Sequence, residues 1–147
     1  MEFMTGVAKK EDLEISEILA GDYEGKDILV KGAVHTIRDM GDVAFVVLRK
    51  REGLMQCVYE AGVSQFDLKE LKEADTLEVE GTVGKEDRAP NGFELRMKNV
   101  KILSEPVEAM PLQISKWKLN TSLEAKLNYR SISLRNIRER AKFRIQE

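Results

Sequence analysis

Five stretches of strand-type sequence lie between residues 27 and 103, and this succession limits the possible folds more than any other feature. Three stretches rich in β-branched or continuous apolar residues come first, and two alternating stretches follow a polar interval. The stretches are 27–38, 43–49, 53–59, 76–87 and 93–103. We therefore expect a mainly β domain in which a three-strand meander precedes two further strands.

The interval between the third and fourth strands predicts a short helix. Residues 64–75 place three apolar side chains at helical spacing, and Ser64 is the expected N-cap. The order β-β-β-α-β-β, with Gly32 and Gly81 inside strands where a closing sheet coils sharply, is typical of a five-stranded OB-fold barrel. The pattern alone leaves open an unrelated small antiparallel barrel or sandwich.

Helical patterns flank the barrel region on both sides. Residues 12–20 carry apolar side chains at roughly helical spacing. After the last strand, two prolines within residues 106–111 interrupt any ladder and indicate a linker. Two helical stretches follow, the first capped by Thr121 or Ser122 and the second beginning near Asn136. The fold is therefore expected to end in a hinge and a C-terminal helical segment.

Composition excludes several kinds of site. The 147 residues include one cysteine, Cys57, and one histidine, His35, so a single chain can form neither a disulfide nor a Cys/His zinc site. We expect Cys57 to be a small core residue and His35 a residue on the strand surface, neither of them catalytic. The sequence contains no apolar run of about 18 residues, so no membrane contact is expected and the protein is predicted to be cytoplasmic.

Charge is distributed unevenly along the chain. The net charge is −2, but residues 126–147 contain seven Lys or Arg against two Glu, a net charge of +5, so the preceding 125 residues carry −7. Broad, non-specific binding of nucleic acid requires a basic surface. An acidic body therefore argues against a non-specific binder, and any nucleic-acid site must be local.

The first three predicted strands carry side chains that a plain strand does not need. Phe45 and Gln56 stand among mostly aliphatic residues on the second and third strands, across which an OB-fold binds oligonucleotides, and Arg38 closes the first strand. A short turn after Arg49 would place Phe45 and Gln56 as a cross-strand pair, with Arg38 alongside. An aromatic ring stacks on an unpaired base and an amide reads a base edge. The stretch predicts a nucleic-acid-reading surface.

Each of these residues also has a plainer interpretation. Phe45 fits a barrel core and Gln56 fits a solvated strand position. Arg38 and the basic run Arg49–Arg51 fit ordinary surface charge. Truncation of Phe45 separates the interpretations, because loss of a core residue lowers stability whereas loss of a stacking platform lowers binding.

The sequence resembles one family over most of its length. The family is the aspartate, asparagine and lysine subgroup of class II aminoacyl-tRNA synthetases. Residues 31–58 resemble its N-terminal anticodon-binding domain; they read KGAVHTIRDMGDVAFVVLRKREGLMQCV. APNGFELRMKNVKILSE and MPLQI are similar to the subgroup's last barrel strand and hinge, and LNYRSISLRNIRERAKFRIQE to the beginning of its motif 1 helix. Aspartyl-tRNA synthetases of archaeal and eukaryotic type are the most similar, followed by the asparaginyl enzymes.

The resemblance implies a role for four residues. Phe45 would stack on the central uracil of the aspartate anticodon, and Gln56 and Arg38 would form hydrogen bonds around it. Glu94 would contact an anticodon base. The resemblance implies no catalytic residue and no metal ligand within this chain.

Two positions depart from the subgroup's pattern. Ala33 stands where the subgroup usually has Trp, which is expected to alter packing. Lys50 stands where many members have Asp, and it is expected to change how the adjacent turn meets phosphates. Neither residue is among the four that the resemblance implies contact the anticodon.

The resemblance divides the chain into four parts. These are an N-terminal extension with a short helix (1–23), the OB-fold domain (24–105), a hinge (106–128) and the start of a truncated catalytic domain with the motif 1 helix (129–147). The family's ligation of an amino acid to tRNA uses ATP and Mg, whose binding motifs would lie beyond Glu147. We therefore expect no cofactor and no activity in this chain, and a homodimeric full-length parent.

Two other classes of protein remain open. One is a stand-alone OB-fold that binds single-stranded nucleic acid with weak sequence preference. The other is an interaction domain without a nucleic-acid role, in which Phe45 belongs to the core. The acidic body argues against the first class.

Overall fold

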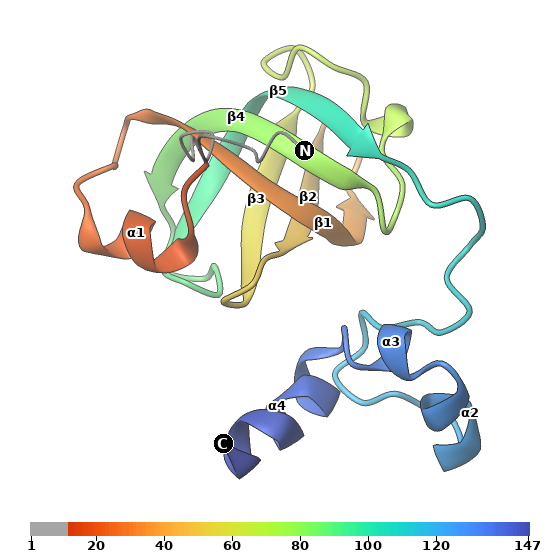
Figure 1. Cartoon of the computed structure of the whole chain (residues 1–147). Coiled ribbons are helices and arrows are strands. Elements are labelled where there is room, and N and C mark those ends of the chain that lie inside the picture. The colour runs from red at the N-terminus through yellow and green to blue at the C-terminus, as the bar shows by residue number, and fades with distance from the viewer. Residues whose placement is uncertain (1–11) are drawn as a thin grey trace, which may run out of the picture.

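The computed structural model describes residues 12–147 and confirms the mainly β architecture (Figure 1). The strands are β1 (Asp27–Asp39), β2 (Val43–Arg49), β3 (Leu54–Glu60), β4 (Thr76–Lys85) and β5 (Phe93–Ser104). The helices are α1 (Ile15–Ala20), α2 (Leu123–Asn128), α3 (Arg130–Ser133) and α4 (Ile137–Gln146), with a 3-10 helix η1 (Leu68–Glu70). Residues 1–11 of the predicted N-terminal extension lie outside the described residues.

The five strands form one closed barrel in the order β1-β2-β3-β5-β4. β1 pairs antiparallel with β2 and, on its other side, with β4. β2 and β3 form an antiparallel hairpin, β4 and β5 another, and β3 runs parallel to β5. This is the strand arrangement expected of an OB-fold.

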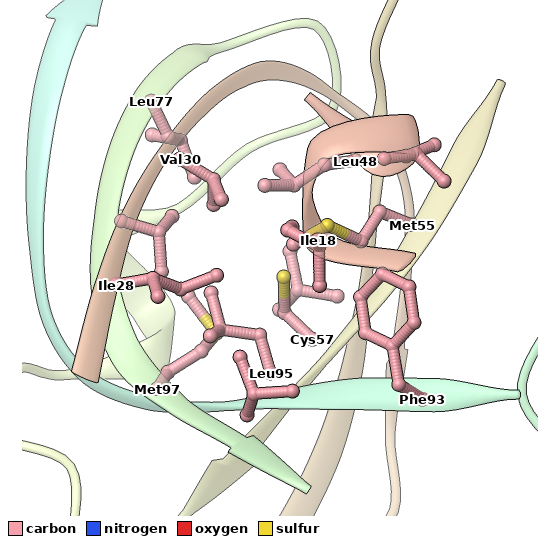
Figure 2. Packing of buried hydrophobic residues seen from close by; sticks show 14 of the residues in the cluster. Ile18, Ile28, Val30, Leu48, Met55, Cys57, Leu77, Phe93, Leu95 and Met97 are labelled. Atoms are coloured by element: carbon pink, nitrogen blue, oxygen red, sulfur yellow. The ribbon is translucent and has the colours of Figure 1, made fainter. Parts of the chain in front are cut away.

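Alternation along the strands fills the barrel with apolar side chains (Figure 2). Ile15 and Ile18 of α1 join this core from outside the sheet. Cys57 is fully buried and burial raises its pKa to about 12, so the prediction of a small core residue is confirmed. The fully buried side chains include Val30, Val34, Val46, Leu48, Met55, Leu77, Val79, Leu95 and Met97. Each such burial contributes about 1.5–3 kcal/mol relative to exposure.

The β4–β5 hairpin bends at Gly81. The register shifts between Glu80 and Gly81, so β4 and β5 approach each other closely at this point. A Cβ atom at Gly81 would collide with the backbone carbonyl oxygen of Arg96. The position therefore requires glycine, as the coiling of the predicted strand indicated.

The predicted helix over residues 64–75 is wrong in extent and in its cap. Only the single turn of η1 forms, and its cap is Asp67, whose side chain accepts a hydrogen bond from the Lys69 N–H at 3.0 Å. The hydroxyl of Ser64 instead donates to the carbonyl oxygen of Met97 at 2.7 Å. The Gln65 N–H donates to the carbonyl oxygen of Lys98, so this part of the chain follows β5 and cannot begin a helix.

The C-terminal helical segment follows an extended stretch after β5 (Figure 1). Ser122 caps α2, since its hydroxyl accepts a hydrogen bond from the Ala125 N–H at 3.1 Å, and Asn136 caps α4. Both helix starts were predicted. Among the described helices, none is long and apolar enough to span a bilayer. The strands occupy residues 27–104 and α2 lies within the predicted hinge; the four domain boundaries stay predictions.

Asn136 joins α4 to the extended stretch. It is 2% exposed, and its side-chain N–H groups donate to the carbonyl oxygens of Ile114 at 2.9 Å and Lys116 at 2.6 Å. Its side-chain oxygen accepts from the N–H groups of Arg138 and Glu139. One buried amide therefore both caps the helix and fixes the path of residues 114–116.

Candidate nucleic-acid interface

A groove of about 380 Å³ lies on the outer surface of the barrel. Its size falls within the range of about 300–1,000 Å³ that is common for ligand sites. We call it the strand groove; it is lined by Arg38, Met40, Phe45, Gln56, Val58, Glu86, Arg88 and Glu94. All four residues predicted to bind nucleic acid therefore lie around one hollow.

Phe45 faces this groove because of the alternation along β2. Ala44, Val46 and Leu48 are buried in the barrel, so the intervening side chain points outward. Phe45 is half-buried and does not belong to the core cluster. The interpretation of Phe45 as a core residue is therefore wrong.

Arg38 lies over the ring of Phe45. The two residues are direct cross-strand partners of β1 and β2, and the guanidinium carbon of Arg38 lies 5.9 Å from the ring centroid. This distance is at the outer limit of a cation–π contact. A planar cation and an aromatic ring therefore stand together at the edge of the groove, and Arg38 is exposed.

Gln56 is held by Glu94. Its side-chain N–H donates to a carboxylate oxygen of Glu94 at 3.3 Å, a contact between β3 and β5. Gln56 is only 9% exposed, so the interpretation as a solvated strand residue is wrong. The hydrogen bond orients the amide in the groove.

The predicted cross-strand pair of Phe45 and Gln56 is wrong in register. Phe45 pairs with Val58, and Gln56 pairs with Val47. The reason is the length of the turn, in which the Lys50 N–H donates to the Gly53 carbonyl oxygen at 2.8 Å. Phe45 and Gln56 consequently lie diagonally on the same face, where aromatic and long side chains still reach one another.

Lys50 does not face the solvent. Its side chain is 1% exposed, and its Nζ donates to the carbonyl oxygen of Lys31 at 2.6 Å. The carboxylate of Glu14, beside α1, lies 3.9 Å from the same nitrogen. The expectation that Lys50 is surface charge is therefore wrong, because the residue points inward. Its expected effect on phosphate contacts stays a prediction.

His35 is buried rather than on the strand surface, so that prediction is also wrong. It lies where the β1–β2 register shifts between Val34 and Thr36, which breaks the alternation that placed it outside. His35 is 4% exposed, and burial, followed by the nearby charge of Arg49, lowers its pKa. The imidazole is therefore kept neutral.

Arg88 and Glu86 were not predicted as site residues. They come from the connection between β4 and β5, although the sequence placed Glu86 in the fourth predicted strand (76–87), and they line the groove. Loops carry no hydrophobic period that would reveal them. These residues could have been predicted from the charges in this loop, because OB-folds use the same loop to bind their ligands.

Comparison with known proteins agrees with the OB-fold. Residues 28–103 match the family model described as the OB-fold nucleic acid binding domain. This chain belongs to that family. The match covers all five strands of the OB-fold except their outermost residues.

Similar relatives of this OB-fold chain are much longer proteins. The aspartate–tRNA(Asp/Asn) ligase of Deinococcus radiodurans is 36% identical over 124 residues, which are 84% of this chain and 27% of that protein. The asparaginyl-tRNA synthetase of Pyrococcus horikoshii, solved with asparaginyl-adenylate, superimposes with a TM-score of 0.66 at 26% identity, over 78% of this chain and 26% of that one. An aspartyl-tRNA synthetase of Entamoeba histolytica, at 21% identity, supports the fold alone, with a TM-score of 0.74 over 92% of this chain and 35% of that one.

Proposed function

We propose that this chain recognises the anticodon loop of an aspartate-accepting tRNA as part of an aspartate–tRNA ligase. The observation that carries the proposal is the convergence of Arg38, Phe45, Gln56 and Glu94 around the strand groove. They come from four different strands, so only the folded barrel brings them together. A relative at 36% identity that is named aspartate–tRNA(Asp/Asn) ligase supports this choice of nucleic acid.

The aromatic ring of Phe45 supplies affinity. An unpaired base stacks on such a ring with about 1–3 kcal/mol whatever its identity. Because the ring is half-exposed on a rigid strand, it is ready to accept a base without rearrangement of the barrel. Arg38, beside the ring, supplies a cation and hydrogen-bond donors for the base or its phosphate.

The amide of Gln56 supplies discrimination. Since one N–H is engaged with Glu94, the remaining N–H and the amide oxygen offer one donor and one acceptor in a fixed orientation. A uracil edge carries a matching N–H donor and carbonyl acceptor, whereas cytosine presents a different pattern. We propose that this pair reads the central base of the anticodon, and that Glu94 also contacts a base.

The activity of a whole synthetase goes beyond this chain, which spans about a quarter to a third of the length of its curated relatives. We propose that the longer protein is a cytoplasmic homodimer that joins aspartate to tRNA using ATP and Mg. An asparagine-specific parent is the alternative, favoured by the likeness to the Pyrococcus horikoshii enzyme.

The proposal is tested by binding. A labelled aspartate anticodon stem-loop is titrated with the chain, beside the same stem-loop with the central uracil replaced by cytosine, at 50 and 200 mM salt. We expect tighter binding of the native loop, with a preference that persists at the higher salt because base contacts do not depend on counterion release. Equal binding of both loops, or no binding, would refute anticodon reading.

A further inference from the structure

A second hollow, of about 80 Å³, lies between the barrel and the C-terminal helices. One wall is the β2–β3 turn and the other is α4, which lies beneath that end of the barrel (Figure 1). We call it the arginine pocket, because Arg49, Arg51, Arg135, Arg140 and Arg144 all line it. These side chains come from two parts of the sequence that the fold brings together.

The arginine pocket has little compensating charge. Glu52 is the acidic residue in its lining, and its carboxylate already accepts hydrogen bonds from the N–H of Ser16 at 2.7 Å and the hydroxyl of Ser16 at 2.8 Å. Within residues 12–147, the five arginines form no ion pair with a carboxylate. Converging guanidinium groups repel one another, so the pocket is complementary to an anion.

Arg49 is the most constrained of the five. Its Nη1 is buried and has no hydrogen-bond partner in the described part of the chain. Burial, and then the charges of Arg135 and Arg140, lower the pKa of Arg49, yet a guanidinium remains charged at neutral pH. A buried donor without a partner is costly. Arg49 lines the pocket, so an oxyanion there would compensate the charge of its guanidinium.

The arginine pocket and the strand groove lie along the same row of side chains. Phe45 and Arg49 both point outward from β2 and are four residues apart, which corresponds to about 13 Å along a strand. Val47 stands between them on the same face. A single strand of RNA whose base stacks on Phe45 would therefore run toward or away from the arginine pocket within a few nucleotides.

We propose that the arginine pocket binds a backbone phosphate of the RNA whose bases occupy the strand groove. The inference rests on the proposed function. Arginine forks match phosphate oxygens in paired hydrogen bonds, and such contacts set position and register without reading sequence. The pocket would thus fix where the RNA lies, while Gln56 and Phe45 decide which base is accepted. It also links the basic C-terminal segment to recognition, although the rest of the chain is acidic.

The test compares two double variants of the 147-residue chain. Arg140→Gln with Arg144→Gln removes two exposed charges from the pocket. Arg138→Gln with Lys118→Gln removes two exposed charges that do not line it, so the change in net charge is the same. The probe is the aspartate anticodon stem-loop, measured by fluorescence anisotropy between 50 and 200 mM salt, with the native or the substituted central base. Thermal unfolding verifies that both variants fold.

We expect the pocket variant to bind about tenfold more weakly than the control at 50 mM salt, as for loss of charged hydrogen bonds. The slope of log K against log salt should become shallower by about 1, for the one phosphate that is no longer neutralised, with the ratio between the two loops unchanged. Equal affinities and slopes in the two variants, with base preference intact, would overturn the phosphate site alone.

Other outcomes separate the two proposals. RNA binding without base preference, but with the reduced slope in the pocket variant, would refute anticodon reading and support the phosphate site. No binding by the unmodified chain would refute both. Sedimentation equilibrium measures whether the chain forms a dimer. If a dimer is lost only in the pocket variant while RNA binding is unchanged, the arginines bind the acidic surface of a second copy, and the inference is overturned.

Discussion

Gln56 on β3 donates a hydrogen bond to Glu94 on β5 across 3.3 Å, although 38 positions separate them in the sequence. An amide that is held at one end has a fixed donor and acceptor direction. Under the proposed function, the pair would act as one reading unit, in which Glu94 orients the amide and Gln56 contacts the base.

Replacement of Glu94 tests this dependence. Glu94→Ala is expected to lower the preference for the native stem-loop over the cytosine-substituted one by about 1–3 kcal/mol, because the freed amide no longer faces one base pattern. Glu80→Ala, which removes an equal charge from an exposed position on β4, is the control. Preferences that match in the two variants would show that Glu94 does not orient the amide.

Phe45 is expected to matter for binding more than for stability. Phe45→Ala should weaken binding of both stem-loops by about 1–3 kcal/mol, since stacking is sequence-tolerant. Phe93→Ala, in the buried core, should instead lower the free energy of unfolding by about 3–5 kcal/mol. Urea unfolding and RNA titration of both variants provide the comparison. A cost in stability at Phe45 as large as at Phe93 would contradict the outward placement.

His35 makes stability depend on pH. Its pKa is lowered in the fold, so the unfolded chain takes up a proton near the ordinary value of 6.5 while the folded chain resists it. The free energy of unfolding is therefore expected to fall as pH decreases below 6.5, by at most about 1.4 kcal/mol per pH unit for this group. In urea unfolding at pH 7, 6 and 5, His35→Gln should show a shallower decline. Parallel declines would mean that another group causes the dependence.

Asn136 holds the helical segment together. Asn136→Ala removes the cap of α4 and both bonds to the extended stretch, and should lower the stability of this segment by about 2–3 kcal/mol. Asn136→Asp keeps the acceptor that caps the helix but loses the donors, so an intermediate loss is expected. Trp117, next to Lys116, reports the segment by fluorescence, while strand circular dichroism reports the barrel. Simultaneous melting of both parts in all variants would contradict a local role.

Much of the fold follows from the sequence because period and turn chemistry are local. The alternation of Leu77, Val79 and Val83 predicted β4, and the polar residues Ser122 and Asn136 predicted two helix starts. The barrel order follows from five strands whose longest interval lies between the third and fourth. These features need no knowledge of distant contacts.

The wrong predictions fall where contacts between residues far apart in the sequence determine the local structure. Ser64 reads as a helix cap, but β5 provides a better acceptor for its hydroxyl. A bulge at His35 turns a surface position into a buried one, and period-2 reasoning cannot detect a bulge. Lys50 is drawn inward by the carbonyl oxygen of Lys31, a contact across 19 positions. Arg88 lies on a loop, where no period exists.

Arg38, Phe45 and Gln56 were predicted from their chemistry together with the resemblance. Glu94 was predicted from the resemblance alone, and the fold gathers all four in one groove. The exact register of Phe45 and Gln56 was beyond prediction because it depends on the length of the turn between Arg49 and Leu54. The prediction that Phe45 and Gln56 lie on the same face of the sheet is still correct, because a register shift of two positions leaves each side chain on its original face.

The parallel pairing of β3 with β5 also orders events during synthesis. A ribosome that has released the chain through Glu60 has already delivered β1, β2 and β3, whose antiparallel turns are short. β5 is delivered more than 30 residues later, and only then can Cys57 and Leu95 become neighbours. Phe45 is thus synthesised before Glu94 exists to orient Gln56. Under the proposed function, selectivity for a base would have to arise later in translation than the residue that stacks on one.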